Sequence, residues 1–186
     1  MPAVICLLRG VNVGGNNKLK MEALRTLFES LQLRNPQTYI QSGNVVFMAV
    51  DKDLETLARR IESAIEKTFG FRPDTILRTV ADMRKVIASN PFGARPEVEP
   101  NKLVVMFLDR SANSAKMKVS KQAAEEFHLA GRELFIYYPE GQGKTKLSIT
   151  PLDEGSKPIP FTGRNWNSVI KLLEMTSQTF GVLNAA

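Results

Sequence analysis

The sequence contains few of the residues that cross-link small proteins or bind metals, with one cysteine and one histidine among 186 residues. A single cysteine excludes an internal disulfide and a cysteine-based metal cluster. Cys6 lies within an apolar run, which predicts a buried, inert thiol. His128 has no obvious carboxylate partner or second ligand, so the sequence indicates neither a Ser-His-Asp arrangement nor a metal site. We expect no metal and no cofactor, and no catalytic constellation is identifiable.

Long hydrophobic runs are also missing. None approaches the ~20 residues that a membrane-spanning helix needs, and the N-terminus lacks the basic region, apolar run and cleavage site of a signal peptide. The composition, 43% hydrophobic and 24% charged, is typical of soluble globular proteins. We therefore expect a cytoplasmic protein that does not contact membranes. Its length suits one large domain or two small packed halves.

Acidic residues are too few to balance the basic ones, and the net charge is +6. The excess lies in two segments that contain glycine-bearing turns: residues 1–50 carry five basic and two acidic side chains, and residues 110–150 carry seven and four. A modest basic field attracts anions. It is too weak to require nucleic acid as the partner.

Hydrophobic periodicity predicts the order strand, helix, two strands, helix, strand in the first part of the chain. The longer of the two helices has an apolar stripe formed by Leu54, Leu57, Ala58, Ile61 and Ile65. The expected elements are strand 3–9, helix 20–32, strands 37–40 and 44–50, helix 51–70 and strand 71–80. This order is the ferredoxin-like, or split βαβ, arrangement.

The second part of the chain is expected to repeat this topology. The expected elements are helix 81–90, strand 101–109, helix 112–127, a hairpin turning at Ala130-Gly131, a long loop over 139–163 and helix 165–178. We therefore predict an α+β fold of two ferredoxin-like halves packed together, a topological duplication. The halves would be 1–90 and 102–186, joined by a proline-rich connection over 91–101.

The stretch "LLRGVNVGGNNKLKM" places glycines and asparagines where a strand gives way to a helix. It is not a P-loop, because Asn16 and Asn17 stand where the Lys-Ser/Thr pair should follow the second glycine. Glycine-rich backbone at a helix entry can still present N–H groups to an anion. The predicted ligand-binding residues are Arg9, Gly10, Asn12, Gly14, Gly15, Asn16 and Lys18. The alternative is that glycine and asparagine serve only the turn.

Three other segments carry candidate binding residues. The turn "QSGN" offers amide and hydroxyl groups, and it should lie beside the first loop because the first two strands of a split βαβ unit are parallel. "TGRNWNSV" places an arginine at an expected helix start, where a bound anion would be favourable. "GQGKTKLS" carries two lysines on a glycine-flanked loop. The candidates are Gln41, Ser42, Asn44, Lys144, Lys146, Arg164, Asn165, Trp166 and Asn167. Ordinary turns, packing and solvated loops are the alternatives.

The blocks "RGVNVGG", "YIQSGNVVF" and "TGRNWNSV" lie at Arg9–Gly15, Tyr39–Phe47 and Thr162–Val169. With "RTVADMRKVIASNPF" and "GKTKLS" between them, they resemble, in order and over nearly the whole chain, the family called domain of unknown function 1697. The resemblance implies a bacterial cytosolic protein with two ferredoxin-like α+β halves, and it implies no activity, substrate or catalytic residues. The proline-rich segment 149–163 departs from relatives, which continue into a helix-like stretch there.

Three functional hypotheses follow. The first is a protein that binds, and if it is an enzyme transforms, a small phosphate-bearing or other anionic ligand at the basic Gly/Asn-rich loops. The second is a nucleic-acid-binding ferredoxin-like sheet, for which Phe47 is the one candidate aromatic. The third is a non-catalytic interaction module. The sequence leaves the oligomeric state and the existence of a reaction open.

Overall fold

The computed structural model describes residues 1–113, 116–120 and 124–180. Within them the chain has a mixed α+β fold with several antiparallel sheets and four α-helices. It divides into two compact units, Met1–Arg84 with Lys171–Ala186, and Lys85–Ile170. The boundaries therefore fall inside two helices, α3 (Val80–Ala88) and α4 (Trp166–Phe180). The predicted halves and their connection over 91–101 stay a prediction.

The first unit contains a four-stranded antiparallel sheet in the order β2-β3-β1-β4. Its elements are β1 (Ala3–Leu8), α1 (Met21–Ser30), β2 (Arg34–Tyr39), β3 (Asn44–Met48), α2 (Leu54–Phe69) and β4 (Thr75–Thr79). The element order predicted for this part of the chain is confirmed. Because β3 is antiparallel to both β1 and β2, those two strands run in the same direction. Their C-terminal ends therefore lie at one edge of the sheet.

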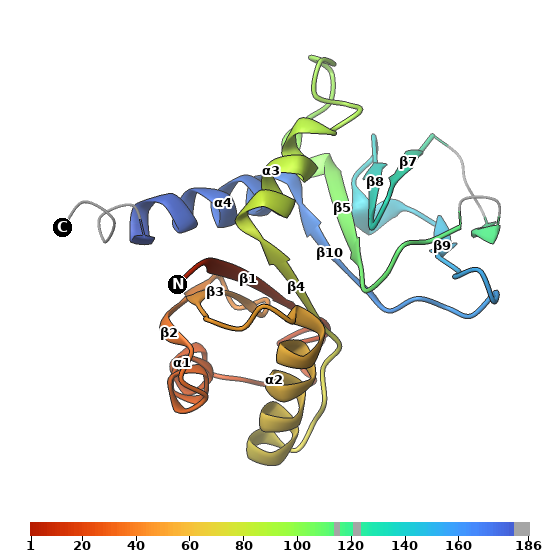
Figure 1. Ribbon diagram of the computed structural model, residues 1–186. Helices are drawn as coiled ribbons and strands as arrows, with labels where there is room; N and C mark the ends of the chain where they lie inside the picture. The colour runs from red at the N-terminus through yellow and green to blue at the C-terminus, as the bar shows by residue number, and fades with distance from the viewer. Residues whose placement is uncertain (114–115, 121–123, 181–186) are drawn as a thin grey trace. The chain divides into compact units, whose positions relative to one another are not determined.

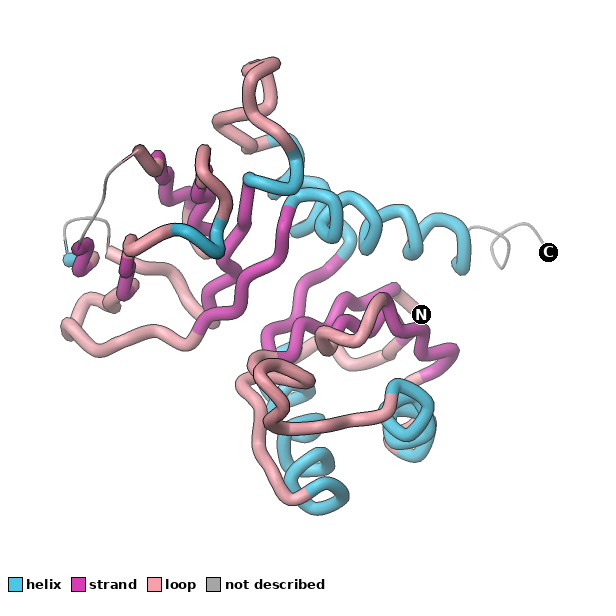
Figure 2. Tube along the Cα trace, turned by 180° about the vertical axis from the view of Figure 1, so that it is seen from behind, coloured by secondary structure: helices cyan, strands magenta, loops and turns pink. Residues whose placement is uncertain are grey.

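Helices α1 and α2 cover one face of this sheet (Figures 1 and 2). Their buried residues include Leu24 and Phe28 from α1 and Leu57 and Ile61 from α2. These side chains join Phe47 of β3 in one hydrophobic core, where the rings of Phe28 and Phe47 meet edge to face at 5.2 Å. The apolar stripe predicted for the longer helix is confirmed, because all five of its residues lie in this core or pack against it.

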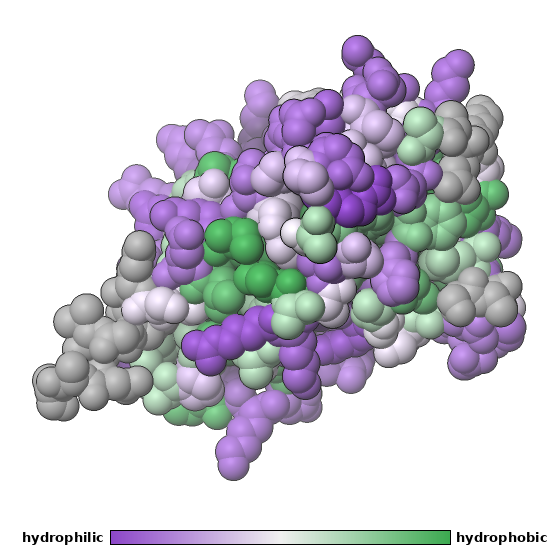
Figure 3. Space-filling model, turned by 90° about the horizontal axis from the view of Figure 1, so that it is seen from above, coloured by the Kyte–Doolittle hydropathy of each residue, from purple (hydrophilic) through white to green (hydrophobic). Residues whose placement is uncertain are grey.

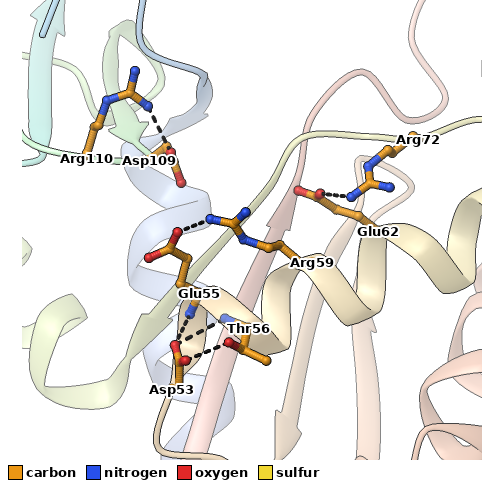
Figure 4. A network of polar contacts seen from close by, with 8 residues as sticks. All are labelled: Asp53, Glu55, Thr56, Arg59, Glu62, Arg72, Asp109 and Arg110. Atoms are coloured by element: carbon orange, nitrogen blue, oxygen red, sulfur yellow. Dashed lines mark hydrogen bonds and ion pairs between the residues drawn. The ribbon is translucent and has the colours of Figure 1, made fainter.

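Both ends of α2 are fixed by local residues, and Figure 4 shows those at its start. The Asp53 carboxylate accepts hydrogen bonds from the backbone N–H groups of Glu55 and Thr56 and from the Thr56 hydroxyl. These bonds hold the pKa of Asp53 below its usual value, and the two hydrogen bonds from Thr56 have the largest effect. Gly70 ends the helix in the left-handed region, at φ 79°, and its N–H donates to the Glu66 carbonyl.

The second unit is built on another four-stranded antiparallel sheet, in the order β10-β5-β8-β7. Its strands are β5 (Leu103–Leu108), β7 (Glu126–Ala130), β8 (Glu133–Tyr137) and β10 (Phe161–Asn165), and a separate two-stranded sheet pairs β6 (Lys118–Ser120) with β9 (Ser148–Thr150). The described residues of the unit also form the short 3-10 helices η1 (Pro100–Lys102) and η3 (Gln142–Lys144). The hairpin predicted at Ala130-Gly131 is confirmed.

Two expectations for this unit are wrong. The helix predicted over 112–127 does not form in the described part of that range, where β6 and the start of β7 lie instead. Residues 161–163, expected in a loop, begin β10, which pairs with β5 along its length. Its sequence, "FTGRN", has no strand-like alternation, so tertiary pairing decides its conformation. Among the described residues, no α-helix lies between β5 and β7 or between β8 and β10, and a ferredoxin-like second half is not established.

Arg95 fixes the proline-rich segment to the second sheet. Its guanidinium donates two hydrogen bonds to the Glu126 carboxylate, at 2.7 and 3.0 Å, and one to Glu97 at 2.7 Å. It also lies over the ring of Tyr137, 5.7 Å from the centroid. The hydrogen bonds from Arg95 hold the pKa of Glu126 below its usual range. A segment without regular secondary structure is thereby tied to β7 and β8.

No helix within the described residues is long and apolar enough to cross a membrane. Hydrophilic and hydrophobic residues are interspersed on the face drawn in Figure 3, as is common on protein surfaces.

Candidate functional site

The glycine-rich loop that follows β1 folds back on itself. The Asn12 N–H donates to the Asn17 carbonyl at 3.2 Å, and the Asn16 N–H donates to the Val13 carbonyl at 3.1 Å. Gly14 and Gly15 form the tip, both with positive φ and with open space where a Cβ would stand. The tip therefore exposes its backbone directly to solvent, and a ligand can approach it closely.

Asn12 clamps this loop to the hairpin between β2 and β3. Its side-chain Nδ2 donates to the carbonyl oxygens of Leu19 and Gln41, at 2.9 and 2.8 Å, and its Oδ1 accepts from the Leu19 N–H at 2.8 Å. Asn12 itself has a φ of 55°, which asparagine tolerates better than most residues. The side-chain amide of Asn12 is therefore used within the protein, which is the turn role that the sequence offered as the alternative.

Close packing at Gly43 also joins the hairpin to the loop. Gly43 has a φ of 72°, and a Cβ there would lie 2.8 Å from the Leu8 Cβ and 3.3 Å from the Val11 Cβ. Its carbonyl accepts a hydrogen bond from the Leu8 N–H at 2.9 Å. The buried Asn44 next to it donates to the Tyr39 carbonyl and to the Ser42 hydroxyl oxygen. Side chains larger than hydrogen do not fit at position 43.

We call this surface, residues 9–19 and 40–43, the loop–hairpin platform. Its cations are exposed. Arg9 forms an ion pair with Asp74 at 3.0 Å, with both side chains about half exposed, so the pair is weak. The side chain of Lys18 is exposed and has no hydrogen-bond or ion-pair partner among the described residues. The first loop and the QSGN turn lie side by side, as predicted from the parallel direction of β1 and β2.

The remaining candidates belong to the second unit. Lys144, in η3, and Lys146 are exposed and line a pocket of about 250 Å³. Asn165 caps α4, because its Oδ1 accepts from the Ser168 N–H at 2.9 Å. Asn167 is exposed in the first turn of that helix. A single site that combines these residues with the platform stays a prediction.

Arg164 is not at a helix start. It lies on β10, is 7% exposed, and its Nη1 donates to the Thr162 hydroxyl oxygen and to the Gly163 carbonyl, at 2.8 and 2.7 Å. Trp166, the first residue of α4, packs against Phe135 with ring centroids 6.5 Å apart. Arg164 and Trp166 therefore both make structural contacts, and Arg164 is buried.

Sequence reasoning missed a second buried arginine. Arg78 on β4 is 1% exposed, and its Nη1 donates to the Leu77 carbonyl at 3.0 Å. It stands opposite Ile5, the third residue of β1, as Arg164 stands opposite Val105, the third residue of β5. The signal in the sequence was an arginine inside the apolar strand "TILRTV". Among the described residues, no group of three or more His, Cys, Asp and Glu could hold a metal ion.

The fold and this surface define a two-unit α+β protein with antiparallel sheets and an exposed Gly/Asn-rich platform. The chain belongs to the family described as "Protein of unknown function (DUF1697)", whose pattern matches residues 1–135. The chain is similar in fold to a structure described as that of the conserved bacterial protein SP0830 from Streptococcus pneumoniae. That likeness has a TM-score of 0.69 and 20% identity, and it covers 94% of this chain and 98% of the other. No curated protein matches the chain.

Proposed function

We propose that the first unit binds a small phosphate-bearing or other anionic ligand on the loop–hairpin platform. The observation that carries the proposal is the exposed glycine tip beside a lysine without a partner. Gly14 and Gly15 leave backbone N–H groups open to close approach, and Lys18 supplies a positive charge. Oriented backbone N–H groups and a cation together form a common anion-binding arrangement.

The rigidity of the platform supports the same proposal. The three hydrogen bonds of Asn12 and the close contact at Gly43 hold both loops in one conformation. A surface that is already ordered loses less conformational entropy when it binds. Arg9 is held at the edge of the platform by its exposed pair with Asp74. An anion competes with that carboxylate at little cost, because exposed ion pairs contribute little stability.

The test is thermal unfolding in the presence of nucleotides, sugar phosphates, polyphosphate, and short RNA and DNA. A ligand at ~100 times its dissociation constant stabilises the folded protein by about 2.7 kcal/mol. Lys18→Gln should weaken binding about tenfold, because a charge-assisted contact is lost. Lys52→Gln is the matched control: Lys52 is also exposed and unpartnered among the described residues, but it follows the opposite end of β3. Equal ligand affinity in the two variants would refute the proposal that the ligand binds on the loop–hairpin platform.

Nucleic-acid binding on the sheet is the second candidate, and it has less support. Phe47, its one candidate for base stacking, is fully buried against Phe28. A rise in the unfolding temperature that is seen only with oligonucleotides and is abolished by salt would favour nucleic-acid binding. An unfolding temperature that no compound changes would favour the third hypothesis, a non-catalytic interaction module.

We further propose that the two units are a topological duplication of the ferredoxin-like arrangement. In each four-stranded sheet, the strand that comes first in the chain lies between the strands that come third and fourth: β1 lies between β3 and β4, and β5 lies between β8 and β10. The buried arginines Arg78 and Arg164 occupy equivalent positions on the fourth strands, and a helix cap follows each directly. At the start of α3, the Thr79 N–H donates to the Asp82 carboxylate and the Asp82 N–H donates to the Thr79 hydroxyl oxygen. At the start of α4, the Ser168 N–H donates to the Asn165 Oδ1 in the same way. The cytoplasmic location stays a proposal from the sequence.

A further inference from the structure

The loop–hairpin platform carries two large hydrophobic side chains that are mostly exposed. Val13, on the first loop, is 61% exposed, and Ile40, on the hairpin, is 54% exposed. The residues beside them in sequence join the two loops, because the Asn12 side chain donates to the Gln41 carbonyl at 2.8 Å. Single exposed hydrophobic residues are common on protein surfaces. Two of them on adjoining loops, with the exposed Lys18 on the same platform, form a surface suited to a ligand that has both an anionic and an apolar part.

The backbone at Ile40 is strained, and a different residue would relieve the strain. Ile40 has a φ of 49°, in the left-handed region, where a β-branched residue is a rare and costly exception. The other residues of the platform with positive φ are all glycine or asparagine, which adopt this conformation at less cost. The turn therefore uses the left-handed backbone at position 40, but it does not require isoleucine there.

Packing within the first unit does not account for an isoleucine at this position. Within the described part of the chain, neither Ile40 nor Val13 belongs to the hydrophobic core around Phe47 or packs against it. Residues held in a strained backbone conformation cluster at sites that bind ligands. An apolar side chain that is both strained and exposed to solvent therefore points to an apolar group on the ligand.

We propose that the ligand of the platform is a phosphate monoester whose organic part is a hydrocarbon, not a sugar or another polyol. Its phosphate would lie at the Gly14-Gly15 tip and Lys18, and its hydrocarbon part would cover Val13 and Ile40. This contact would remove apolar surface from water on both sides. The hydroxyl groups of a sugar in the same place would lose hydrogen bonds to water without finding partners on the two side chains. The inference rests on the proposed function, because it names the class of ligand for the same site.

The experiment is isothermal titration of the full chain with phenyl phosphate and hexyl phosphate, compared with glucose phosphate, glycerol phosphate and inorganic phosphate. We expect the two hydrocarbon esters to bind about tenfold more tightly than the two polyol esters, because only the hydrocarbon esters bury apolar surface. Equal affinity for the two kinds of ester would overturn this inference and leave the proposed function standing. No binding by any of these phosphates, or binding that Lys18→Gln does not weaken, would overturn both.

The variant Ile40→Asn tests the residue with two independent measurements. Asparagine tolerates the left-handed backbone, so the midpoint of urea unfolding should not fall. The preference for hydrocarbon esters over polyol esters should shrink severalfold, while the affinity for inorganic phosphate should stay the same. A lower midpoint would show that Ile40 serves packing, and an unchanged preference would show that it does not contact the ligand. Either result would overturn the assignment.

The matched control is Val50→Asn. Val50 is 69% exposed and belongs to the same unit, but it follows the end of β3 opposite to the hairpin. This change should leave the preference for hydrocarbon esters as it is in the parent protein. An equal loss of preference in Val50→Asn and Ile40→Asn would overturn the placement of the hydrocarbon part on the platform.

Discussion

Replacing Gly43 by alanine should destabilise the first unit far more than the same change at Gly70. Both residues lie in the left-handed region, at φ 72° and 79°. An alanine at either position therefore carries the same backbone penalty, roughly 1–2 kcal/mol. The two sites differ in space. The new Cβ at position 43 would lie 2.8 Å from the Leu8 Cβ, whereas nothing lies within 4 Å of it at position 70.

The crowding at position 43 cannot be relieved by a side-chain rotation. Leu8 is buried, and the contact involves its Cβ, which moves only with the backbone. Overpacking of this kind costs about 1–3 kcal/mol, so the expected totals are about 2–5 kcal/mol for Gly43→Ala and about 1–2 kcal/mol for Gly70→Ala.

Urea unfolding followed by circular dichroism measures both variants, with the m-value as a check that the denatured state has not changed. If Gly43→Ala were no less stable than Gly70→Ala, the close packing of the hairpin against β1 would be refuted. The platform would then lack the rigidity on which the proposed function depends.

Three further changes test the fold. Ile61→Ala should lower the free energy of unfolding by about 2–5 kcal/mol, because this fully buried side chain lies in the first core; an unchanged urea midpoint would contradict that packing. Arg164→Ala should cost about 1–3 kcal/mol in the same assay, since the buried Thr162 hydroxyl and the Gly163 carbonyl lose their donor; full stability would indicate an exposed side chain. For Asp53, whose pKa is lowered in the folded state, the stabilising contribution is present above the unfolded pKa of about 3.9 and is lost as the pH falls through the folded value. The difference in urea midpoint between the parent and Asp53→Asn should therefore shrink towards low pH, and a constant difference would argue against the cap.

The parts of the fold that were predictable are those that local residues determine. Helix α2 has an acidic cap, a buried stripe and a terminal glycine, and each of these signals lies within its own sequence. Strand β10 has no such signal. It contains Gly163, a cationic side chain and no alternation, and it becomes a strand because β5 offers it an edge. The helix expected over 112–127 does not form because strand pairing overrides a helix-like composition: Lys118–Ser120 pairs with β9, and Glu126–Ala130 pairs with β8.

The candidate site was predictable where topology determines it. The parallel direction of two strands was enough to bring the first loop to the QSGN turn. The roles of single side chains were not predictable, because an asparagine that binds a ligand and one that binds the backbone, as Asn12 does, have the same letter in a sequence. The pocket beside the end of β8 was not predicted, because its lining comes from two separate segments of the chain, 124–125 and 138–146.

The division of the chain has a consequence for biosynthesis. The first unit contains Met1–Arg84 and also Lys171 onward, while the second unit is the continuous stretch between them. During translation the second unit leaves the ribosome in full before the first unit receives the last part of α4. Synthesis from the N-terminus forward therefore supplies the first unit in two parts: residues 1–84 come before the inserted unit, and the part of α4 from Lys171 comes after it.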